Sequence, residues 1–132
     1  MVGVWIGDDE SWEQFKIDTN NFGILTWEFE EPSNSIDFLD LTISIEGNRI
    51  TTKTYQKALN LYQYIPSTSE HPTWMMKGII YGLMQNYHRQ NTKKDNYNNM
   101  AQKLFQRHVA RGWNVSVMRD YILSADAKLQ LQ

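Results

Sequence analysis

The chain has 132 residues, enough for one domain or for one small domain with a helical appendage. It contains no cysteine, which excludes disulfides and cysteine-bound zinc and fits an intracellular setting. No apolar run approaches the roughly 18 residues of a membrane span, and Asp8, Asp9 and Glu10 stand where a signal peptide carries positive charge. We therefore expect an intracellular protein without a membrane span.

The net charge of −2 conceals an asymmetry along the chain. Residues 1–71 carry 12 acidic and 4 basic side chains, a net of −8, whereas residues 72–132 carry 3 acidic and 9 basic ones, a net of +6. Such a division indicates two structural units, of which the C-terminal one suits a polyanion. Opposite charges would equally help the two halves dock on each other.

The N-terminal third predicts a strand, a helix and a second strand. Residues 1–6 are a short apolar run that favours a strand. The carboxylates of residues 8–10 and Ser11 then supply helix-start chemistry, which predicts a short helix over 10–20. Residues 24–30 alternate between apolar and polar side chains, as in a strand with one buried face and one wet face.

The clearest strand pair in the sequence spans residues 36–45 and 49–55. The residues between them, Glu46, Gly47 and Asn48, suit a tight turn because Gly and Asn tolerate positive φ. With residues 25–29 as a third strand, this pair predicts an antiparallel β-meander with the short helix packed on one side.

From Pro72 onward the apolar spacing is helical. It predicts a first helix over about 72–90 and a second over about 96–111, with Asp95 as a cap and Gly112 as a stop. Asn114 or Ser116 then caps a third helix that reaches about residue 127. Three short helices with a tight glycine turn are typical of a helix-turn-helix bundle.

The predicted fold class is therefore α+β: a short helix packed on a small antiparallel β-meander, followed by a three-helix, helix-turn-helix-like bundle. We expect three segments along the chain. Residues 1–57 form a partial α+β unit, residues 58–71 a linker, and residues 72–132 a basic helical unit.

Acidic residues are the first candidates for a catalytic metal site. Asp8 and Asp9 follow Gly7, as in the Gly-Asp-Asp turn of polymerases, but a helix start follows them where that turn needs a strand. Helix capping is the interpretation we prefer, and catalysis is the alternative. Asp37 and Asp40 are three residues apart on the predicted strand and point to opposite faces. The three histidines lack ligand-like spacing, so we expect no catalytic residue and no metal ligand in this chain.

Basic side chains on the helices give the stronger signal. They can neutralise successive phosphates, although a merely solvated helix face is the alternative. Because the helical segment has a net charge of +6 and carries aromatic residues nearby, we favour nucleic-acid contact. The side chains are Lys103, Arg107 and Arg111 at a spacing of four, and Arg89, Lys93 and Lys94 at the preceding turn.

Short segments across residues 2–113 carry a family resemblance. They are Trp5, ESWEQF (10–15), NNFG (20–23), LTW (25–27), IDFLDLTI (36–43), TYQKALN (54–60), YIP (64–66), HP (71–72), GIIYG (78–82) and RGW (111–113). In order and spacing they resemble the C-terminal palm and thumb part of a retroelement reverse transcriptase related to Penelope-like elements.

The resemblance implies the end of a palm followed by a thumb-like helical bundle. In that family of RNA-directed DNA polymerases, a catalytic Tyr-x-Asp-Asp turn comes before the segment that resembles residues 2–5, so we expect a truncated segment without the catalytic aspartates. The complete enzyme is expected to use Mg²⁺, whereas this chain alone is not expected to polymerise. Residues 51–57 would lie where such enzymes grip the primer end, which adds Lys53, Tyr55 and Lys57 to the nucleic-acid contacts. The implied partners are an RNA/DNA template–primer and the N-terminal part of the polymerase.

Three hypotheses follow from the sequence. The first is a reverse-transcriptase segment that binds template–primer nucleic acid through its basic helices. The second is a protein–protein interaction module whose acidic and basic halves self-associate. The third is a complete enzyme that uses Asp8 and Asp9, for which we expect no primer extension.

Overall fold

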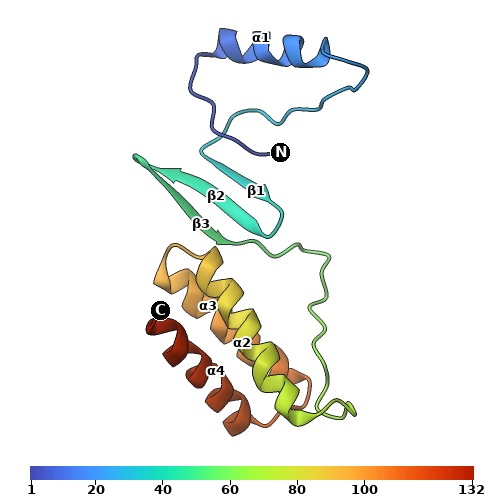
Figure 1. The fold of residues 1–132 in the computed structure, drawn as a ribbon, viewed down its shortest axis with the longest axis vertical. Coiled ribbons are helices and arrows are strands. Elements are labelled where there is room, and N and C mark those ends of the chain that lie inside the picture. Colours follow the sequence, from blue (N-terminus) through green and yellow to red (C-terminus); the bar gives the residue numbers. More distant parts are fainter. The chain divides into compact units, whose positions relative to one another are not determined.

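The computed structural model describes all 132 residues (Figure 1). They form two compact units, Met1–Asn34 and Ser35–Gln132. The order of elements is one helix, a three-stranded antiparallel sheet and then three helices, which confirms the predicted α+β class. None of the helices is long and apolar enough to cross a membrane.

The first unit is built around helix α1, Asp9–Asn20, which begins one residue earlier than predicted. The Asp8 carboxylate caps it by accepting a hydrogen bond from the Ser11 N–H at 2.8 Å, and this bond lowers the pKa of Asp8. Four aromatic rings cluster on one side of the helix with centroids 5.1–5.9 Å apart: Trp5, Trp12, Phe15 and Phe29. Aromatic packing thus joins α1 to both flanking segments.

The two strands predicted in this unit, over residues 1–6 and 24–30, are wrong, because both segments are extended chain outside any sheet. The backbone of Trp27 illustrates the reason. Its N–H donates to the Asn20 side-chain oxygen at 2.7 Å, and its carbonyl accepts from the Asn20 amide at 3.3 Å. A side chain of α1 therefore occupies the groups that a neighbouring strand would pair.

The second unit opens with the sheet, whose strands are β1 (Ser35–Phe38), β2 (Leu41–Glu46) and β3 (Arg49–Thr54) in that order (Figure 1). The single strand predicted over residues 36–45 is wrong, since the chain reverses at Leu39 and Asp40 and pairs Phe38 with Leu41. Leu39 takes a positive φ of 54° there. The sheet thus gains its third strand from this hairpin and not from residues 25–29.

The register gives the sheet two different faces. Each face follows from the alternation of side chains along a strand. Rows of partners on the polar face are Ser35, Ser44 and Thr51, then Asp37, Thr42 and Lys53; on the other face they are Ile36, Ile43 and Thr52, then Phe38, Leu41 and Thr54.

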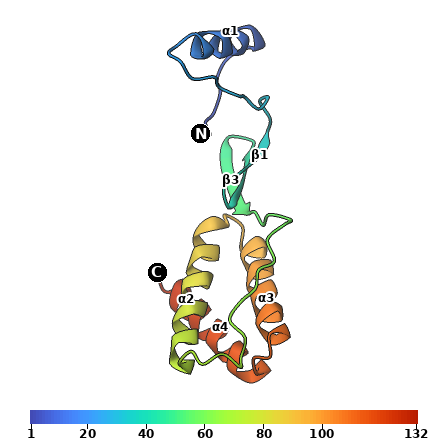
Figure 2. The same cartoon turned by 90° about the vertical axis from the view of Figure 1, so that its right-hand side faces the viewer.

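Three helices complete the second unit: α2 (Thr73–Gln90), α3 (Lys94–Ala110) and α4 (Val115–Gln130). They enclose the buried core of Met76, Ile80, Met84, Tyr87, Tyr97, Met100, Leu104, Met118, Ala125 and Leu129. The predicted apolar stripes therefore face one another inside the bundle. Figure 2 shows the three helices gathered in that bundle.

The helix ends agree with most of the predicted caps. Asn114 caps α4 by accepting from the Val117 N–H at 3.2 Å, and Gly112 ends the preceding turn with φ of 92°. A Cβ atom at Gly112 would lie 2.5 Å from the Ser67 hydroxyl, which would have to rotate away, and the positive φ disfavours any residue with a side chain. The Asp95 cap is wrong: α3 starts at Lys94, which puts Asp95 inside the first turn.

The turn between α2 and α3 joins the bundle to the sheet. The Thr52 N–H donates to the Thr92 hydroxyl at 2.9 Å, and the Thr92 N–H donates to the Thr52 carbonyl at 3.0 Å. The Asn91 carboxamide accepts from the Thr54 N–H at 3.0 Å and donates to the Thr54 hydroxyl at 2.8 Å and to the Tyr87 carbonyl at 2.7 Å. These bonds occupy the outer edge of β3, so the sheet belongs to the helical unit and the predicted boundary after residue 57 does not divide them.

The predicted linker, residues 58–71, is fixed to α3 along much of its length (Figure 2). The Arg107 guanidinium lies 4.2 Å from the Tyr62 ring centroid and donates to the Gln56 side chain at 3.0 Å. Further along, the bonds run from Arg111 Nε to the Tyr64 carbonyl at 3.0 Å, from Trp113 Nε1 to the Ile65 carbonyl at 2.8 Å and from the Ser67 N–H to the Arg111 carbonyl at 3.1 Å. The segment is thus an ordered strap over the bundle.

His108 lies wholly inside the core, as its place in the apolar stripe suggested. Its Nδ1 is 2.9 Å from the Leu104 carbonyl, its ring stacks on Tyr64 at 4.4 Å, and its Nε2 has no hydrogen-bond partner. Burial lowers the pKa of His108, so the ring is neutral at pH 7 and Nδ1 donates to the carbonyl.

The edge bonds predict a large effect of truncating Asn91. In an Asn91→Ala variant the Thr54 N–H loses its partner and the Tyr87 carbonyl keeps only the bond from the residue 91 backbone N–H, which we expect to lower the free energy of unfolding by about 1–3 kcal/mol in urea titrations. The control is Asn86→Ala, an exposed residue of α2, which should change the free energy of unfolding by less than about 0.5 kcal/mol. Equal effects in the two variants would refute the role given to Asn91.

The buried imidazole predicts a pH dependence. The unfolded chain binds a proton at His108 near the ordinary pKa of about 6.5, whereas the folded chain binds it only at lower pH. Stability should therefore be complete above that pH and fall below it, by up to about 1.4 kcal/mol per pH unit from this group. Urea titrations between pH 8 and pH 5 should show this slope in the wild type and in His88→Gln, and a smaller slope in His108→Phe. A slope in His108→Phe equal to that of the wild type would contradict the assignment of this pH dependence to His108.

Candidate nucleic-acid interface

The nine residues predicted to contact nucleic acid do not form one uniform basic stripe. Arg107 and Arg111 hold the strap described above, and the Nη1 atom of Arg107 is itself buried. Lys93 forms an ion pair with Glu46 at 2.8 Å, and Tyr55 is half-buried. The cations that remain exposed without an ion-pair partner are Lys53, Lys57, Arg89, Lys94, Lys103 and Arg111, the last of which holds the strap through its Nε.

In the stripe of Lys103, Arg107 and Arg111, only Lys103 makes no hydrogen bond to the chain; Arg111 is exposed but donates from Nε to the Tyr64 carbonyl, and Arg107 is half-buried. Spacing by four does place the three side chains on one side of α3. Two of them are engaged because the strap crosses that side of the helix and offers a side-chain amide, a carbonyl and an aromatic ring.

A better candidate lies where the polar face of the sheet meets the start of α3. A hollow of about 260 Å³ opens there, and we call it the polar hollow. Hydroxyl, amide and ammonium groups dominate its lining. Its residues are Thr42, Ser44, Glu46, Thr51, Thr52, Lys53, Lys93 and Asn96.

The charges in the polar hollow favour an anion. Glu46 is its single carboxylate, and the ion pair with Lys93 lowers the pKa of Glu46. Lys53 has no ion-pair partner, so its ammonium group is the one charge of the lining without a counter-charge there. Of the hydroxyls beside it, that of Thr42 donates to Asp37 and that of Thr51 bonds Glu46. Hydroxyl and ammonium donors together are the groups that proteins use to bind phosphate oxygens.

Helix α3 continues the same surface away from the hollow. Asn96 lines the hollow, and Asn99 and Lys103 follow it at intervals of three and four residues, on one side of the helix. No side chain caps the amino end of α3, so the positive end of its dipole adds to the potential near the hollow. We call Asn96, Asn99 and Lys103 the polar ridge.

Of the nine predicted residues, two line the hollow and one lies on the ridge: Lys53, Lys93 and Lys103. Lys57, Arg89 and Lys94 are exposed but do not line the hollow. The sequence prediction missed the hydroxyl and amide groups. Their signal in the sequence is the alternation of polar side chains along β2 and β3.

Two of the four carboxylates that suggested a metal site, those of Asp8 and Asp37, have structural partners. Asp8 caps α1, and Asp37 accepts a hydrogen bond from the Thr42 hydroxyl at 2.5 Å. Asp40 belongs to the turn between β1 and β2, where its carbonyl accepts from the Tyr55 N–H at 2.8 Å. No group of three or more His, Cys, Asp or Glu side chains is arranged to hold a metal ion. The surface as described can bind and orient an anionic polymer.

Comparison with known proteins adds no relative. No model of a known protein family matches the sequence, and no curated protein or solved structure matches it either. Function must therefore be argued from the charges and geometry of the chain.

Proposed function

We propose that Ser35–Gln132 is a nucleic-acid-binding unit and that the polar hollow and polar ridge contact the phosphate backbone. The observation that carries the proposal is the composition of the hollow, where an unpaired ammonium group and several hydroxyls surround one neutralised carboxylate. Such a surface recognises backbone and not base sequence, because it offers donors to phosphate oxygens.

The charge of the whole unit supports the same proposal. Ser35–Gln132 carries 12 basic and 7 acidic side chains, a net of +5, whereas Met1–Asn34 carries 1 basic and 8 acidic ones, a net of −7. The structural boundary thus separates the two signs of charge. A net positive unit attracts a polyanion over distances of about the Debye length, roughly 10 Å at 0.1 M salt.

The resemblance to retroelement reverse transcriptases supplies the kind of nucleic acid. In that family, residues matching 51–57 lie at the primer end, and Thr51, Thr52 and Lys53 line the polar hollow here. The proposed ligand is therefore an RNA/DNA template–primer, and the proposed partner is the part of a polymerase that carries the catalytic aspartates and Mg²⁺. On this proposal the chain contributes grip on the duplex and no chemical step.

The second candidate is an interaction module that joins copies of the chain. The opposite net charges of the two units, −7 and +5, favour it. Self-association of this kind would weaken as salt rises, because exposed charges are screened.

An anisotropy titration with a labelled RNA–DNA hybrid of about 12 base pairs tests the primary proposal. Lys53→Gln and Lys103→Gln should each weaken binding and reduce the slope of log affinity against log salt by about 0.9, the value for one lost phosphate contact. Both side chains are exposed and make no ion pair, so the substitutions should leave folding unchanged. Arg107 is a poor choice because it holds the strap.

Arg119→Gln is the control, since it removes one positive charge from an exposed site outside the hollow and the ridge. It should leave the salt slope for the hybrid unchanged. Equal effects of all three substitutions would overturn the assignment of the surface. Absence of hybrid binding at 50 mM salt, together with salt-sensitive dimers in sedimentation, would replace the proposal with the interaction module.

A further inference from the structure

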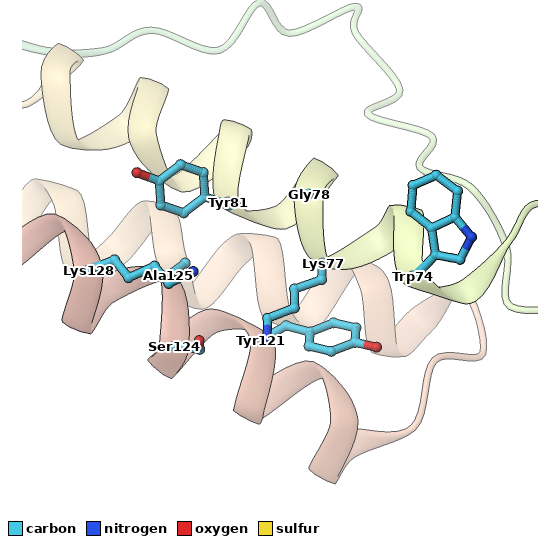
Figure 3. Close-up of a pocket in the computed structure, with 8 residues that line it drawn as sticks. All are labelled: Trp74, Lys77, Gly78, Tyr81, Tyr121, Ser124, Ala125 and Lys128. Carbon is cyan, nitrogen blue, oxygen red and sulfur yellow. The ribbon is translucent and has the colours of Figure 1, made fainter.

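A second surface of the bundle has the chemistry of a ligand site. A groove of about 280 Å³ lies between α2 and α4, two helices that do not line the polar hollow (Figure 3). Trp74, Lys77 and Tyr81 come from α2, and Tyr121 and Lys128 come from α4. We call this surface the aromatic groove.

The aromatic residues of the groove are open to a ligand. Trp74 is 76% exposed at the start of α2, and its ring packs on no other aromatic ring. Tyr121 is half-buried, with its ring at the same opening (Figure 3). Gly78 lies between the turns that carry Trp74 and Tyr81, and a Cβ atom added there would meet nothing within 4 Å. The missing side chain leaves the floor of the groove open between the rings.

The charge of the groove is positive along its whole lining. Lys77 and Lys128 both line it, and no carboxylate does. The Lys128 ammonium group lies 5.8 Å from the centroid of the Tyr81 ring, which keeps a cation beside an aromatic surface. Flat rings with flanking ammonium groups match a ligand that has flat rings and negative charges at short intervals.

We propose that the aromatic groove binds an unpaired nucleic-acid strand, with bases stacked on Trp74 and Tyr121 and phosphates near Lys77 and Lys128. Base stacking on aromatic side chains is available to a single strand, whereas a duplex hides the faces of its bases. The volume of the groove, about 280 Å³, lies just below the range of ligand sites, which span roughly 300–1,000 Å³, so the groove holds about one nucleotide of a strand that continues over the surface. The proposal does not rest on the polar hollow, because it involves other helices and another form of nucleic acid.

Anisotropy of a labelled eight-nucleotide oligouridine at 50 mM salt tests the groove. Trp74→Ala should weaken binding by about 10-fold or more, the effect of removing one stacking platform, and Trp74→Phe should restore most of it. Lys77→Gln and Lys128→Gln should each reduce the salt slope by about 0.7, the value for one phosphate of a single strand. Arg119→Gln, at an exposed site outside the groove and the hollow, should change the affinity less than twofold.

Two sets of outcomes overturn the proposal. Oligouridine binding that Trp74→Ala leaves within twofold of wild type would place the strand elsewhere. Displacement of oligouridine by an acidic, aromatic peptide at lower concentration than by unlabelled oligouridine would make the groove a peptide site. If Trp74→Ala fails to fold, the salt slope of Lys128→Gln is the test, and a slope equal to that of the wild type overturns the proposal. If the hybrid binds in a Lys53-dependent way and oligouridine does not bind, the proposal for the groove alone is overturned. If oligouridine binds in a Trp74-dependent way and the hybrid does not bind, the proposal for the hollow alone is overturned.

Discussion

The outer edge of β3 must find hydrogen-bond partners, and the turn between α2 and α3 provides them. A strand edge left open in a small sheet invites pairing with other chains. Here Thr92 takes the place of a neighbouring strand, because it exchanges two hydrogen bonds with Thr52. The Asn91 carboxamide accepts from the Thr54 N–H and also donates to the Tyr87 carbonyl in the last turn of α2. The attachment of the sheet to the three helices depends on this junction, because no strand lies inside the bundle and no helix lies within the sheet.

The junction also creates the candidate binding surface. With the turn fixed to the outer edge of β3, the start of α3 and the polar face of the sheet line the same hollow. Lys93 belongs to this arrangement in two ways, since it precedes the first residue of α3 and neutralises Glu46 on β2. The fold thus brings together hydroxyls from two strands and donors from a helix about 45 residues further along the chain.

Much of the fold could be predicted from the sequence. The three helices of the bundle follow from apolar spacing, and their ends from Gly112 and Asn114. The hairpin at Leu39 could not be predicted, because the alternation of side chains continues through a two-residue turn that lacks glycine. Residues 24–30 alternate as a strand does, yet Asn20 of α1 takes the backbone groups that a strand would use.

The site was less predictable than the fold, for a physical reason. Helical spacing says which side chains share a face, but it does not say what crosses that face. Arg107 and Arg111 share the side of α3 with Lys103 and are nevertheless engaged by the strap. Thr42 and Thr51 belong to the hollow only through strand register, and the aromatic groove joins residues of α2 and α4 that are about 45 positions apart.

Native-state hydrogen exchange of the full chain tests the central claim, that the sheet and the bundle form one unit through the turn at Asn91 and Thr92. The amides of Thr52 and Thr54 should open with the same free energy as those of Ile80 and Leu104 in the core, within about 1 kcal/mol. Exchange of the two β3 amides at a free energy several kcal/mol lower, with the helices still protected, would contradict the claim and remove the structural basis of the polar hollow.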